Sequence, residues 1–142
     1  MIDPDVAFNH GVAHRLALAL ATLVVGQTLP SESDVPFEPF TLAFDRDTSV
    51  TAMSLGRALG VGPEREVVMS SATGFFERLV TSTDDPGAQQ VFAVLEHVMR
   101  RGLSGLKQVF VRGEGVVEVP FFVFGRLAGG PLVGLRSIAI ET

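Results

Sequence analysis

The sequence predicts a mixed α+β fold in which a mostly antiparallel sheet is sandwiched between helices. Apolar residues recur at helical spacing before residue 26 and again over residues 86–101, which indicates amphipathic or buried helices. Residues 108–140 alternate instead with a period of two, which is typical of strands. Hydrophobic residues make up 46% of the chain and charged residues 19%, so the composition supports a buried core rather than disorder.

The first helix contains the most apolar segment of the chain. Asp5 or Asn9 is expected to cap its start, and Gly26 to end it after about Val25. The stretch LALALATLVVG resembles the apolar part of a signal peptide, but acidic residues precede it, no cleavage site follows, and it is too short to span a bilayer. We therefore expect a buried helix in a soluble, cytoplasmic protein. The residues expected to face inward are Leu16, Leu20, Leu23 and Val24.

Three further helices are expected, at residues 48–59, 75–80 and 86–101. The last of them is the best defined, because a proline and a glycine open it and two arginines lie in its final turn. The residues expected to face inward on this helix are Val91, Val94, Leu95 and Val98.

Five strands are expected, and the last three are separated by glycine-containing turns at residues 113–115 and 129–130. The C-terminal part therefore predicts a three-strand antiparallel meander packed by helices, in an α-β-α sandwich. With 142 residues and no internal repeat, residues 1–142 are expected to form a single domain. The expected strands are residues 40–44, 66–70, 108–112, 116–124 and 132–140.

The charge balance argues against direct binding of nucleic acid. The chain has 16 acidic and 11 basic residues and a net charge of −5, without a dense basic patch that could neutralise phosphates. The same sign of charge suits a basic protein partner. The chain has no cysteine, which excludes disulfides and thiolate metal sites and fits a reducing compartment.

No catalytic set can be assembled from the sequence. There is no G-x-S-x-G nucleophile motif, and His10 and His14 have helical spacing for two metal ligands but no third one. The acidic pairs in Asp45–Asp47 and Asp84–Asp85 could hold a metal, but loop carboxylates more often cap helices and bond their own backbone. We therefore expect a protein that is not an enzyme and has no cofactor or metal of its own.

Two segments add a more specific pattern. The first is SESDVPFEPF at residues 31–40, after the first helix. The second runs from Val111 to Thr142 and contains a VRGE hairpin, a glycine-containing turn, the strand LVGL and a final Glu-Thr. Together they resemble the nuclease A inhibitor family of small bacterial proteins, in order and in spacing.

This resemblance implies an α-β-α sandwich that binds and inhibits a metal-dependent, DNA/RNA non-specific endonuclease. It further implies that Thr142 enters the active site of the nuclease and approaches the metal of the nuclease through water. Glu32, with Asp34 in the same loop, is expected to pair with basic residues of the groove. The family has an Asp-Trp contact in the loop before the last helix, where this chain has Asp84 and Asp85 but no aromatic residue. Asp84 and Asp85 are therefore expected to contact the partner.

Other interpretations remain open. The missing aromatic residue permits an adaptor of the same fold with a different, non-nuclease partner. Without the resemblance, Glu32 would be interpreted as a solvated loop acid and Thr142 as a frayed chain end. Glu38 and Glu118 are expected to have structural roles in the sheet or its hairpin. An enzyme is the least favoured alternative, because no nucleophile and base are paired.

Overall fold

The computed structural model describes residues 4–28 and 35–141 of the chain. All the expected helices and strands are present within these residues, with bounds that differ by a few positions. The elements in chain order are α1 (Pro4–Leu23), β1 (Glu38–Leu42), α2 (Ala52–Leu59), β2 (Arg65–Ser71), α3 (Thr73–Thr81), α4 (Pro86–Gly102), β3 (Ser104–Gly113), β4 (Glu118–Arg126) and β5 (Leu132–Ile140).

The five strands form one sheet in the order β1-β5-β4-β3-β2, and every neighbouring pair is antiparallel. Because β3, β4 and β5 are consecutive in both the chain and the sheet, the predicted C-terminal meander is confirmed. β1 pairs with β5 from Glu38↔Arg136 to Leu42↔Leu132. β5 is therefore an interior strand, with β1 on one side and β4 on the other.

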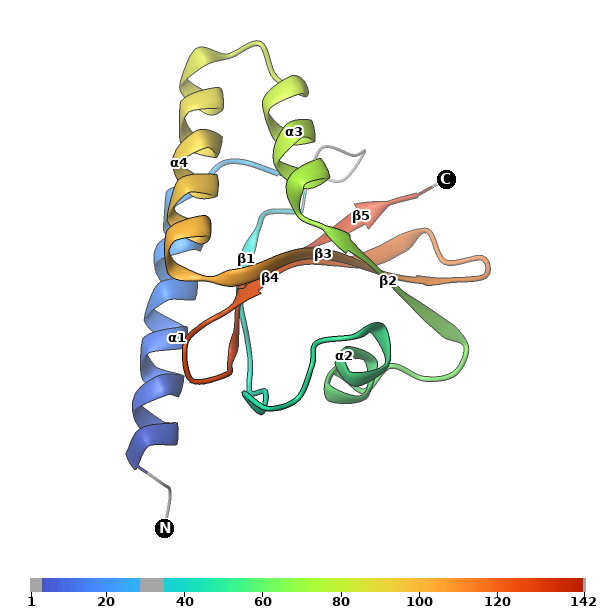
Figure 1. Cartoon of the computed structure of the whole chain (residues 1–142). Helices are drawn as coiled ribbons and strands as arrows, with labels where there is room; N and C mark the ends of the chain where they lie inside the picture. The colour runs from blue at the N-terminus through green and yellow to red at the C-terminus, as the bar shows by residue number, and fades with distance from the viewer. Residues whose placement is uncertain (1–3, 29–34, 142) are drawn as a thin grey trace.

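The sheet separates two apolar clusters, one covered by three helices and the other by a single helix (Figure 1). We call the side covered by α1, α3 and α4 the three-helix face and the side covered by α2 the α2 face. The alternation of side chains along a strand explains the division. On β4, Val119, Phe121 and Val123 belong to the cluster of the three-helix face, whereas Phe122 and Phe124 belong to that of the α2 face. The predicted α-β-α sandwich is confirmed.

α1 packs on the three-helix face along β1 and β5. It begins at Pro4, so Asp5 and Asn9 lie within the helix, and the expectation that one of them caps it is wrong. Leu16, Leu20, Leu23 and Val24 contribute to the inward side as expected, and Ala13 and Ala17 are fully buried beside them. Within the described residues, no helix is long and apolar enough to cross a lipid bilayer.

α4 presents a different inward side from the one expected. Its buried residues are Ala88, Phe92, Leu95 and Met99, while Val94 is 42% exposed. Val94 lies two positions after Phe92, which is about 200° around the helix, so it cannot share a face with that larger side chain. The expectation is therefore correct for Leu95 and wrong for Val94. Val91 and Val98 pack at the margin of the cluster.

Candidate functional site

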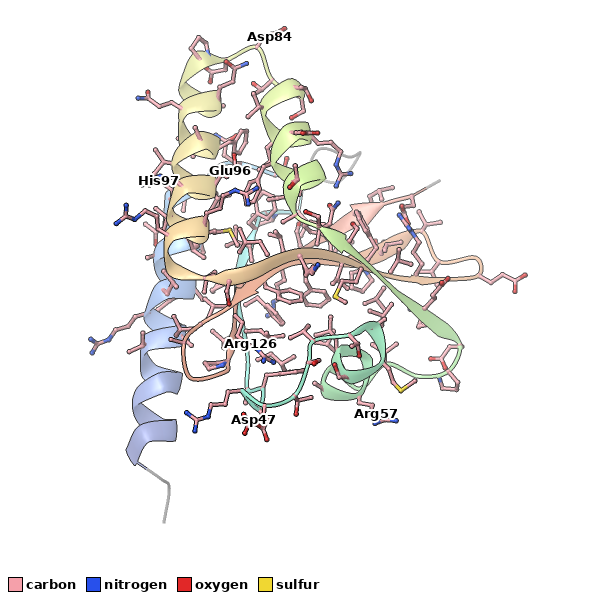
Figure 2. The ribbon with its side chains drawn as sticks, viewed as in Figure 1. Asp47, Arg57, Asp84, Glu96, His97 and Arg126 are labelled. Atoms are coloured by element: carbon pink, nitrogen blue, oxygen red, sulfur yellow. The ribbon has the colours of Figure 1, made fainter. Side chains whose placement is uncertain are left out.

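The residues expected to contact a partner lie in three parts of the chain. Glu32, Asp34 and Thr142 lie outside the described residues. Asp84 and Asp85 lie in the loop between α3 and α4. Figure 2 shows Asp84 at the tip of that loop, well apart from the end of β5. The structure therefore does not bring the loop acids next to the end of β5.

Asp85 has a structural role in this loop. It is the N-cap of α4, and its Oδ1 accepts a hydrogen bond from the backbone N–H of Gly87 at 3.0 Å. This bond satisfies one of the free amides in the first turn of the helix. Asp84 and Asp85 are both exposed, and of the two only Asp85 caps the helix.

Replacement of Asp85 by Ala is expected to destabilise the protein by about 1 kcal/mol, because an amide of the first turn of α4 loses its acceptor. The melting temperature should fall by about 2–4 °C in a thermal unfolding experiment. Asp84→Ala is the matched control, because Asp84 does not cap the helix. Equal melting temperatures for the two variants would contradict the capping role of Asp85.

β5 carries the backbone to residue 141 in a fixed direction. Ile140, at the end of the strand, pairs in register with Glu118. The N–H of Glu141 then donates to the carbonyl oxygen of Val117 at 2.9 Å. Backbone pairing with the β4 side of the sheet therefore continues one residue beyond the last residue of β5.

The side chain of Glu141 is bound by Arg112 of β3. Nε of Arg112 donates to Oε1 of Glu141 at 2.7 Å, and Nη2 donates to Oε2 at 2.8 Å. This arrangement is a bidentate ion pair. The hydrogen bonds from Arg112 hold the pKa of the Glu141 carboxyl below its ordinary value, although partial burial acts in the opposite sense. Both groups are therefore charged at neutral pH.

The segment 29–34, which contains the two predicted loop acids, is flanked by residues that the sheet holds in place. Thr28 and Pro36 form an isolated antiparallel bridge. Oγ of Ser137, in β5, donates to the carbonyl oxygen of Val35 at 3.1 Å. The residues on both sides of the segment are thus joined to each other, and one side is joined to β5, the strand that leads to the chain end.

Glu38 and Glu118 lie in β1 and β4, which confirms that both belong to the sheet. Glu38 accepts a hydrogen bond from Nε of Arg136 at 3.2 Å, and both side chains are 56% exposed. Such an exposed pair contributes little to stability.

Among the side chains that the structure describes, the other acidic and histidine residues considered for metal binding do not form a cluster. The backbone N–H of Asp47 donates to Oδ1 of Asp45 at 2.8 Å, which is the local backbone bonding expected for loop carboxylates. His14 is exposed on α1. Within residues 4–28 and 35–141, no group of three or more His, Cys, Asp or Glu side chains could hold a metal ion.

Sequence reasoning missed Arg112 and gave Glu141 no role. The signal that could have found them is the period of two in β3 and β5. Phe110 and Ala139 contribute to the cluster of the three-helix face, so Arg112 and Glu141, each two positions further along the chain, fall on the same face. Charged side chains at positions that should face inward indicate a paired charge.

The chain was compared with protein families and with curated proteins. A family model described as nuclease A inhibitor-like protein matches residues 14–142. The matched region contains the whole sheet, α2, α3, α4 and half of α1. No curated protein matches the chain. Because the family model covers nearly the whole chain, the protein belongs to the nuclease A inhibitor-like family.

Proposed function

We propose that this protein is a cytoplasmic, single-domain inhibitor of a metal-dependent, DNA/RNA non-specific endonuclease and has no catalytic activity of its own. Thr142 enters the active site of the nuclease, and Glu32 and Asp34 pair with basic residues of its groove. Membership of the nuclease A inhibitor-like family supports an inhibitory function. The observation that carries the mechanism is the anchoring of β5, which is joined to Val35 on one side and fixed through Glu141 at its end.

This anchoring suits a plug because a rigid strand can hold the residue that follows it in one direction. Thr142 carries a hydroxyl group. This group can take the place of an oxygen of the substrate phosphate and contact the water on the metal of the nuclease. The net charge of −5 favours the approach to a basic groove.

The loop between α3 and α4 is proposed as a secondary contact. Asp84 is exposed there and can meet a basic residue of the partner, whereas Asp85 caps α4. The loop has no aromatic residue, and aromatic side chains often dominate the binding energy of interfaces. The affinity for the nuclease must therefore come mainly from the end of β5 and the loop acids Glu32 and Asp34.

A titration of the protein into metal-dependent, non-specific nucleases, with DNA cleavage as the readout, tests this proposal. The expected result is that cleavage is lost in proportion to the amount of inhibitor added. This loss should not change when unrelated DNA-binding proteins are added as competitors. If no such nuclease is inhibited while an unrelated protein binds specifically, the adaptor function replaces the proposal.

Replacement of Glu32 by Gln is expected to weaken inhibition by about 30-fold, which corresponds to about 2 kcal/mol for the loss of one buried charge pair with the groove. The melting temperature should not change. The measurements are the inhibition constant and a thermal unfolding curve. Glu38→Gln is the matched control, because Glu38 is an exposed acid of β1 that pairs with Arg136 of its own chain. An inhibition constant equal to that of the parent protein would mean that Glu32 is a solvated loop acid that does not pair with the nuclease.

A further inference from the structure

We propose that Arg112 is a positioning residue that fixes the direction in which Thr142 leaves the sheet. The inference rests on the proposed function, because it concerns the mechanism by which the plug is presented. Arg112 has no proposed contact with the nuclease and acts only through Glu141.

The Arg112–Glu141 pair connects two strands that are not neighbours. Arg112 belongs to β3 and Glu141 follows β5, and β4 lies between these strands in the sheet. The side chains meet through two hydrogen bonds of 2.7 and 2.8 Å. The backbone of Glu141 is meanwhile bonded to Val117, which directly precedes β4. Glu141 is therefore held by its backbone on the β4 side and by its side chain on the β3 side. These two attachments leave little freedom for its backbone.

Aromatic rings connect Arg112 to the core. The guanidinium carbon of Arg112 lies 4.7 Å from the ring centroid of Phe110. That ring packs against Phe121 with 5.0 Å between centroids, and Phe121 packs against Phe75 of α3 at 5.4 Å. Phe121 and Phe75 are fully buried. The arginine is thus stacked on a series of rings that are held rigidly, so it can order the side chain that it binds.

The pair also determines which group is available to a partner. Both oxygens of the Glu141 carboxylate accept hydrogen bonds from Arg112, so this acid is neutralised within its own chain. Without Arg112, only the backbone bond to Val117 would remain to hold Glu141, and a single bond at the end of a strand opens readily. Glu141 would then present a free carboxylate next to Thr142 in the chain. That carboxylate could compete with Thr142 for the metal and for basic residues of the nuclease.

A charge exchange tests the positioning role. The variants are R112E, E141R and the double variant R112E/E141R, which restores an ion pair with the charges reversed. R112E changes the net charge from −5 to −7, because one positive charge becomes negative. Long-range attraction to a basic groove alone would make R112E a better inhibitor. Positioning by Arg112 predicts the opposite, an inhibition constant raised at least tenfold.

Two quantities are measured for each variant: the inhibition constant, and the NMR order parameter of the Glu141 amide. The order parameter should be about 0.85 in the parent protein, fall below about 0.6 in R112E and E141R, and recover in the double variant. The inhibition constant should follow the same pattern and return to within about threefold of the parent value. R100E is the matched control, because it has the same charge change and breaks the exposed Arg100–Glu96 pair of α4.

Three results would overturn the inference. The first is an unchanged order parameter in R112E. The second is a lower order parameter without weaker inhibition. The third is an order parameter that recovers in the double variant while inhibition does not, which would assign Arg112 or Glu141 a direct contact with the nuclease. If the parent protein inhibits no nuclease, the proposed function fails, and the order parameters still decide whether Arg112 fixes the chain end.

Discussion

Deletion of Thr142, or the addition of a C-terminal tag, is expected to raise the inhibition constant at least 100-fold. The proposed plug occupies a narrow, water-poor active site, so additional residues would have to share that space, and deletion removes the group that meets the metal water. The fold should be unaffected, because a terminal residue contributes little packing. The measurement is inhibition of DNA cleavage by forms with the tag at either end, with circular dichroism to confirm folding.

Two substitutions at the same position separate the hydroxyl group from the shape of the side chain. Thr142→Ser keeps the hydroxyl and should retain most of the inhibition. Thr142→Val keeps the shape and should lose it. An N-terminal tag is the control for bulk and should not weaken inhibition. Equal potency of the two tagged forms would exclude the plug mechanism and favour an adaptor that uses another surface.

The sequence predicted the fold class because its periodic signals are local. Residues 132–140 form a mostly apolar run after a Gly-Gly-Pro turn, and β5 has those bounds in the structure. β3 begins at Ser104, earlier than expected, because the register with β4 shifts between Ser104 and Lys107 and the alternation is interrupted there. α2 begins at Ala52, later than expected, because Thr51 and Ser54 form a capping box that marks the true start.

The candidate site was less accessible to sequence reasoning. Asp84 and Asp85 are adjacent acids, and only the hydrogen bond to Gly87 reveals that Asp85 is a cap. The contact between Arg112 and Glu141 depends on the registers of β3, β4 and β5 together, and a one-residue shift in either pairing would place the two side chains on opposite faces. The period of two can place both side chains on one face, but no local pattern fixes both registers, so the contact between them becomes visible only in the folded sheet.

Replacement of Gly134 by Ala is expected to destabilise the protein by more than about 4 kcal/mol. Gly134 lies in the middle of β5, between Phe40 of β1 and Phe124 of β4. A Cβ atom at this position would overlap the carbonyl oxygen of Val123 and would lie 2.7 Å from Cα of Phe124. Both atoms belong to the backbone, so a side-chain rotation cannot relieve the overlap. β4 and β5 would have to separate, at the centre of the sheet that presents the chain end.

Gly11→Ala is the matched control for this prediction. Gly11 lies in α1, and a Cβ atom there would have no neighbour within 4 Å. Alanine in a helix is more favourable than glycine by up to about 1 kcal/mol, so this variant should be as stable as the parent protein or slightly more stable. Chemical denaturation measures both variants, and the midpoint for Gly134→Ala should fall far below that of the parent protein. If Gly134→Ala accumulates only as insoluble protein while Gly11→Ala is soluble, the same conclusion holds. A Gly134→Ala midpoint equal to that of the parent protein would mean that β5 can move away from β4 without cost, and the rigid presentation of Glu141 and Thr142 would lose its structural basis.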